Sequence, residues 1–146
     1  MTGTLPPETF RVHPWPERAR GHVVVHVATT LDEMKAGMVA TGVTPAADQL
    51  ACAVGASGRE QHARLVAIVF LAKERLSVDL VAHEMGHVAF RVIEQSGLGK
   101  VRHWEHQALN PQHSEVHASE ETYCDVLERL IGEFWTNFGA SGGASS

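Results

Sequence analysis

Apolar residues gather in three short blocks in the first half of the chain, and their spacing there predicts strands. Residues 22–28 are mostly β-branched and lie between Gly21 and Thr29, as expected of a strand. Residues 64–71 are apolar almost throughout, which predicts a strand that is interior or covered on both faces. Residues 50–55 form a shorter and weaker strand candidate. The pattern therefore predicts a small sheet of about three strands.

Helical spacing dominates elsewhere. Thr30 and Glu33 form a capping pattern for a helix that runs to about Ala40 and stops at residues 41–45. Ser77 is a suitable N-cap for a helix over residues 78–95, with residues 97–118 as a long polar loop. A last helix is expected from Glu120 to about Phe138. The residues predicted to face the core from these two later helices are Leu80, Val81, Met85, Val88, Ala89, Val92, Tyr123, Leu127, Leu130, Ile131, Phe134 and Phe138.

These elements predict an α+β fold with a small mixed sheet. At 146 residues the chain has the length of one domain, which we place at residues 1–139. Four prolines lie in residues 1–21, which we expect to be an irregular arm with a short extended piece at residues 10–13. Residues 57–60 are a predicted turn, and the Gly- and Ser-rich residues 140–146 a flexible tail.

Charge and composition narrow the classes of partner. The formal net charge is −5 and no basic run is present, which argues against nucleic acid as the main partner. No apolar run approaches the roughly 18 residues of a membrane span, and the first residues lack the apolar region of a signal peptide. Cys52 and Cys124 stand apart in apolar contexts, typical of buried thiols in a reducing compartment, so we expect a cytoplasmic protein.

The candidate chemistry lies in the helix predicted over residues 78–95. His83 and His87 are one helical turn apart on one face, with Cβ atoms about 6 Å apart. Two imidazoles at this spacing can bind one Zn²⁺, and Glu84 beside the first can accept a proton from a water on that metal. With ten histidines in the chain, H-E-x-x-H has a chance probability of about 0.06. The motif alone is suggestive, and its place in a predicted helix strengthens it.

A catalytic zinc takes three protein ligands and keeps one position open for water. Glu121, at the start of the last predicted helix, is our candidate for the third ligand, and Asp125 one turn later could accept the spare N–H of a ligating histidine. Glu120 competes with Glu121 for this position. A histidine from the polar loop is a further alternative; the four candidates are His103, His106, His113 and His117.

The sequence His83-Glu84-Met85-Gly86-His87, followed by Glu121 and Asp125, resembles the gluzincin pattern of zinc metallopeptidases. It also resembles the small phage and prokaryotic peptidases of the ImmA/IrrE type. The resemblance covers roughly residues 64–135. It implies a minimal zincin-like domain with an active-site helix and a C-terminal ligand helix. It departs from the family at Glu120, where those enzymes commonly have Asn.

By this resemblance His83, His87 and Glu121 would bind zinc, Glu84 would be the general base, and Asp125 would support His83. The expected function is hydrolysis of a peptide or protein substrate by zinc-activated water. The resemblance also implies that residues 64–71 form the sheet edge along which an extended peptide pairs. Tyr123 could stabilise the oxyanion, although it also fits the core stripe. The alternative is a metal-stabilised interaction or phage-type structural module on the same scaffold, without catalysis. A third interpretation is that no metal binds.

Overall fold

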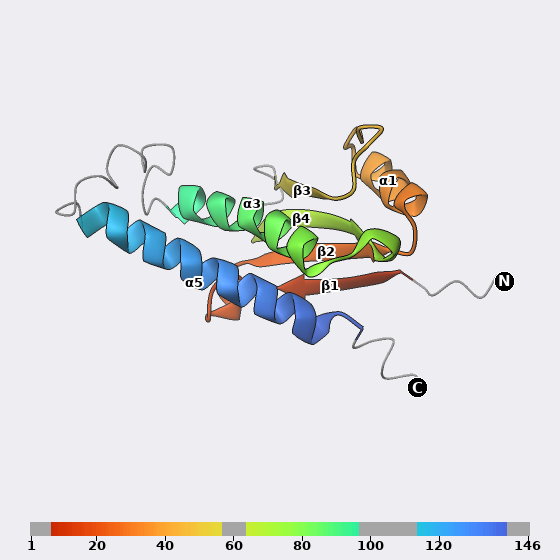
Figure 1. Cartoon of the computed structure of the whole chain (residues 1–146). Helices are drawn as coiled ribbons and strands as arrows, with labels where there is room; N and C mark the ends of the chain where they lie inside the picture. Colours follow the sequence, from red (N-terminus) through yellow and green to blue (C-terminus); the bar gives the residue numbers. More distant parts are fainter. Residues whose placement is uncertain (1–6, 57–63, 97–113, 140–146) are drawn as a thin grey trace.

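A four-stranded mixed sheet is the centre of the structure (Figure 1). The computed structural model describes residues 7–56, 64–96 and 114–139. The two middle strands are parallel to each other, and each edge strand is antiparallel to its neighbour. The order across the sheet is β1 (Glu8–Val12), β2 (His22–Ala28), β4 (Leu65–Ala72) and β3 (Cys52–Gly55).

The α+β fold class is confirmed, with two adjustments to the strands. The sheet has four strands instead of about three, because residues predicted to be an irregular arm form β1 and pair with β2. Residues 10–12 of the short extended piece expected at residues 10–13 are part of this strand, and a 3₁₀ turn, η1 (Arg18–Arg20), follows it. Pro7 precedes the strand and Pro14 and Pro16 follow it, so no proline interrupts it, and the proline content of residues 1–21 did not exclude a strand.

Helices cover both faces of the sheet (Figure 1). On one face, α3 (Val78–Ser96) and α5 (Ser114–Asn137) run side by side in opposite directions. On the other face lies α1 (Leu31–Ala40), and the 3₁₀ turn η2 (Lys73–Arg75) leads from β4 into α3. The sheet is thus the middle layer of three.

The alternation of side chains along the strands explains this layering. Val23, Val25 and Val27 of β2 are fully buried against α3 and α5, as expected where alternate residues point to one face. In β4, Val69 belongs to this same core, whereas Phe70 packs on the opposite face against α1. β4 is therefore covered on both faces, as its continuous apolar sequence predicts.

The predicted starts of α1 and α3 are confirmed at the level of hydrogen bonds. Thr30 Oγ1 accepts from the Glu33 backbone N–H at 3.2 Å, and Ser77 Oγ accepts from the Leu80 N–H at 3.0 Å. α1 ends where Gly42 adopts a φ of +88°, a left-handed conformation that glycine takes without strain.

The predicted start of the last helix near Glu120 is wrong, because α5 begins at Ser114. The pair Ser114-Glu115 is as suitable for a helix N-terminus as the pair Ser119-Glu120. No glycine or proline lies between the two pairs to end the helix. The rest of the predicted loop, residues 97–113, lies outside the described residues. So do the turn at 57–60 and the tail at 140–146.

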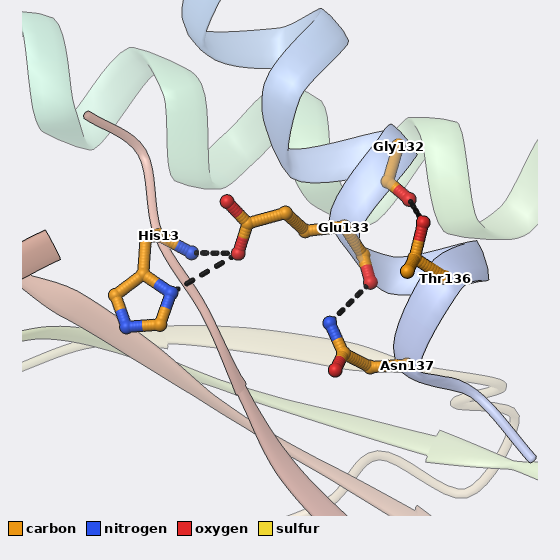
Figure 2. Close-up of polar contacts among 5 residues, drawn as sticks. All are labelled: His13, Gly132, Glu133, Thr136 and Asn137. Atoms are coloured by element: carbon orange, nitrogen blue, oxygen red, sulfur yellow. Dashed lines mark hydrogen bonds and ion pairs between the residues drawn. The ribbon is translucent and has the colours of Figure 1, made fainter. Parts of the chain in front are cut away.

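Residues near the two ends of the described chain hold each other in place. The Glu133 carboxylate on α5 accepts from the backbone N–H of His13 at 2.9 Å and lies 3.0 Å from its ring Nδ1 (Figure 2). Glu8 on β1 forms an ion pair with Lys73 at 2.9 Å and accepts from the backbone N–H of Gly139. These contacts fix β1 against α5. No helix in the described part of the chain is long and apolar enough to span a membrane.

Candidate metal centre

The middle of α3 carries the three residues of the H-E-x-x-H motif, of which the two histidines lie at the molecular surface. His83 and His87 are exposed, one turn apart on the outward side of the helix. Glu84 is rotated by about 100° from His83 and is only 6% exposed. The core side of the same helix carries Met85 and Val88, which are buried under the sheet. Amphipathic spacing thus orients two imidazoles outward and one carboxyl group toward the protein.

The two imidazoles converge on one point. His83 Nε2 and His87 Nε2 are 3.2 Å apart, and the rings meet edge to face with centroids 4.8 Å apart. Two nitrogens on one tetrahedral zinc, each about 2.0–2.1 Å from it, are separated by roughly 3.3 Å. The observed separation therefore fits two ligands of a single zinc ion.

Glu84 is a buried carboxyl group beside these nitrogens. Burial raises the pKa of Glu84, and the neighbouring His87 and His83 oppose that shift. Glu84 makes no hydrogen bond to any residue in the described part of the chain. Its charged form is therefore poorly stabilised by the protein, which favours a group that accepts a proton readily.

A groove of about 500 Å³ runs between α3 and β3 and contains the motif. It is lined by Gln49 and residues 51–55, by Ala67 of β4, and by His83, Glu84, His87, Val88 and Arg91 of α3. A cavity of similar size on the opposite face of the sheet is more apolar and contains none of the predicted site residues. The groove beside β3 is accordingly the candidate site.

The sheet edge beside this groove is β3, and not the strand predicted. β4 pairs with β2 on one side and β3 on the other, so the expectation that residues 64–71 form the edge is wrong. The same apolar sequence that predicted a covered strand places β4 in the sheet interior. β3 is the last strand in the order, and its second edge pairs with no strand among the described residues.

The structure does not bring Glu121 or Asp125 to the histidine pair. Tyr123 faces α3, where its ring packs 4.9 Å from the ring of Phe90. Glu121, two residues earlier, is on roughly the opposite side of the helix and is exposed. Asp125 lines a different cavity, formed with Trp15 on the far side of α5. Glu121 and Asp125 therefore both point away from the pair formed by His83 and His87.

No third His, Cys, Asp or Glu completes a metal-binding group within residues 7–56, 64–96 and 114–139. Glu120 is about 60° from Tyr123 around α5 and is half-buried, so it faces α3 more nearly than Glu121 does. His103, His106 and His113 lie outside the described residues, as does the side chain of His117.

Tyr123 belongs to the core, as its place in the apolar stripe of α5 predicts. A side-chain Cβ built at Gly86 of α3 would lie 3.5 Å from the Tyr123 hydroxyl, so the absence of a side chain there makes room for the ring. Burial raises the pKa of Tyr123, with a smaller contribution from Cys124. The hydroxyl thus stays protonated at neutral pH.

Sequence reasoning missed two parts of this groove. β3 was predicted as a weak strand, without a role at the site. Arg91 was not singled out, although it follows His87 by one helical turn and so shares its side of α3. That i, i+4 spacing was the signal that could have found it.

Comparisons with family models, with curated proteins and with solved structures find no match for this chain. The interpretation of the groove therefore depends on its own geometry.

Proposed function

We propose that this protein is a zinc-dependent metallopeptidase whose active site is the groove between α3 and β3. The observation that carries the proposal is the 3.2 Å separation of His83 Nε2 and His87 Nε2, which matches two ligands on one zinc. Bound zinc would supply a Lewis acid that activates water and polarises a peptide carbonyl. The buried carboxyl group of Glu84 lines the same groove as this pair and would serve as the general base.

The protein side of the reaction is the transfer of a proton and the positioning of the peptide. Glu84 would take the proton of the attacking water and return it to the leaving amine. An extended peptide would add to the free edge of β3, because backbone N–H and C=O groups on an edge strand can pair with a further strand. Residues 51–55 carry no charge or proline that would block such pairing.

The third zinc ligand is proposed from the family resemblance as Glu121, with Asp125 supporting His83. This assignment requires α5 to rotate from the conformation described above. Glu120, or one of the histidines at 103, 106, 113 and 117, is the alternative. Substitution of each in turn, followed by measurement of zinc content, identifies the ligand as the residue whose loss lowers occupancy with the fold intact.

The decisive experiment combines metal content with a single substitution. Protein purified without a His-tag is expected to hold one zinc by elemental analysis and to hydrolyse an unfolded protein substrate. Glu84→Gln should keep the zinc and lose hydrolysis, because it removes the base and leaves both imidazoles. The proposal fails if the wild-type protein holds no zinc, or if Glu84→Gln hydrolyses the substrate at the wild-type rate.

The second candidate function is a metal-stabilised interaction module without catalysis, possible because the described residues supply only two ligands. A partner chain could then complete the site. In that case zinc should increase the molecular mass measured by light scattering, and Glu84→Gln should leave that increase unchanged. A cytoplasmic location is proposed because Cys52 and Cys124 do not form a disulfide.

A further inference from the structure

Arg91 is a cation held inside the groove by its own helix and by β3. It follows His87 by four residues, so it lies about 6 Å further along the α3 axis on the same side. It lines the groove together with His83 and His87. The three side chains form a row along the side of α3 that lines the groove.

The guanidinium lies against the strand backbone at Gly55. A Cβ built on Gly55 would come within 1.9 Å of Arg91 Nε and Nη2 and within 2.0 Å of Cζ. Any other residue at position 55 would push the guanidinium away. The absence of a side chain at Gly55 therefore determines where this charge sits.

Arg91 has no partner for its charge among the described residues. It makes no ion pair or hydrogen bond within that part of the chain, and it is exposed. Among the described residues that line the groove, Glu84 is the only acidic one, and it is buried. A planar guanidinium with several free N–H donors is suited to bidentate binding of a carboxylate.

We propose that Arg91 determines specificity in this groove by binding a carboxylate of the peptide that lies along β3. The 6 Å from His87 to Arg91 corresponds to about two residues of extended chain at roughly 3.3 Å each. The carboxylate is therefore about two residues from the bond opposite the histidine pair. This inference rests on the proposed function, because it takes a peptide to be the occupant of the groove.

Two sources of carboxylate fit, and the direction of the peptide separates them. β3 runs toward the position of Arg91, because Gly55 is its last residue. A peptide antiparallel to β3 would place its N-terminal side there, so Arg91 would bind an Asp or Glu side chain that precedes the cleaved bond. A parallel peptide would place its C-terminal carboxylate there instead.

The test is a binding measurement on the Glu84→Gln protein, which prevents turnover, with and without zinc. Three peptides of one sequence are labelled with an uncharged dye: a Glu peptide with an amidated C-terminus, a Gln peptide with a free C-terminus, and a Gln peptide with an amidated C-terminus. The Glu is moved along the peptide in separate syntheses. Fluorescence anisotropy then gives a dissociation constant for each, independently of activity.

We expect one carboxylate-bearing peptide to bind about tenfold more tightly than the neutral peptide, the size of a favourable charge-assisted contact at an exposed site. Arg91→Ala should abolish this tenfold preference and leave the neutral peptide unaffected. Gly55→Ala should weaken it too, because it displaces the guanidinium while keeping the charge. Arg75→Ala, which removes an exposed arginine outside the groove, is the matched control and should retain the preference.

The inference is overturned if the wild-type groove shows no preference, if no peptide binds, or if Arg91→Ala keeps the preference. Equal weakening of all three peptides would also overturn it, since that result indicates a structural role. Zinc content and protein hydrolysis, measured separately, report on the proposed function. Selective binding without hydrolysis would contradict the peptidase and leave the role of Arg91 intact.

Discussion

Replacing Glu84 by Gln should stabilise the metal-free protein. Glu84 is 6% exposed and has no hydrogen-bond partner among the described residues, so its carboxylate is desolvated, and the nearby His87 and His83 offset that cost only in part. A neutral amide of the same shape avoids most of that cost, which for a buried unsatisfied group is about 1–3 kcal/mol. Because the amide also needs partners, we expect a net gain of about 1–2 kcal/mol. For a chain of this length that raises Tm by roughly 3–7 °C.

Thermal unfolding followed by circular dichroism, in EDTA and at neutral pH, measures this effect. Glu94→Gln is the matched control, since Glu94 is on the same helix, is exposed, and should change Tm by less than about 2 °C. A Glu84→Gln protein that is equally stable or less stable than wild type would refute the reasoning. If Glu84→Gln raises Tm and also removes activity, then Glu84 supports function at a cost in stability.

Three further predictions concern the fold. Glu133→Ala should lower the free energy of unfolding, measured in urea, by about 1–3 kcal/mol, because it leaves the backbone and ring N–H groups of His13 without their acceptor. Glu128→Ala, on the exposed side of α5, is the control and should have little effect. Phe134→Ala should cost about 3–5 kcal/mol in the same assay, since Phe134 is fully buried, and a loss below 1 kcal/mol would show that the core collapses around it. Burial lowers the pKa of His26 below its ordinary 6.5, so the unfolded chain binds a proton at this residue more readily than the folded chain does. Tm should therefore fall as the pH drops below about 6.5, and His26→Gln should make Tm less dependent on pH in that range. An unchanged dependence of Tm on pH in the variant would contradict the lowered pKa of His26.

Local signals in the sequence predicted most of the secondary structure. The caps at Thr30 and Ser77 placed two helix starts correctly, because a side-chain oxygen that satisfies a free backbone N–H acts within one turn. The apolar run of β4 correctly predicted a strand covered on both faces. These features depend on neighbours in sequence, and for this reason a single sequence reveals them.

The order of strands in the sheet could not be read in the same way. Only a short extended piece was predicted in place of β1, because the stability of this strand comes from pairing with β2 and from the contact of the following residue, His13, with Glu133, more than 100 residues away. The edge of the sheet was assigned to β4 instead of β3, because the sequence of an apolar strand does not indicate which strands pair with it.

At the candidate site, the two histidines and Glu84 followed from helical spacing alone. The position of Glu121 around α5 did not, because the helix begins at Ser114 and its apolar stripe fixes which side faces α3.

The contacts of His13 with Glu133 and of Glu8 with Gly139 have a consequence for folding during synthesis. His13 leaves the ribosome 120 residues before its partner Glu133, and Glu8 emerges 131 residues before Gly139. Until α5 emerges, the sheet face formed by Val23, Val25 and Val27 lacks one of its two covering helices. β1 can therefore complete its contacts during cotranslational folding only after α5 and Gly139 have emerged from the ribosome.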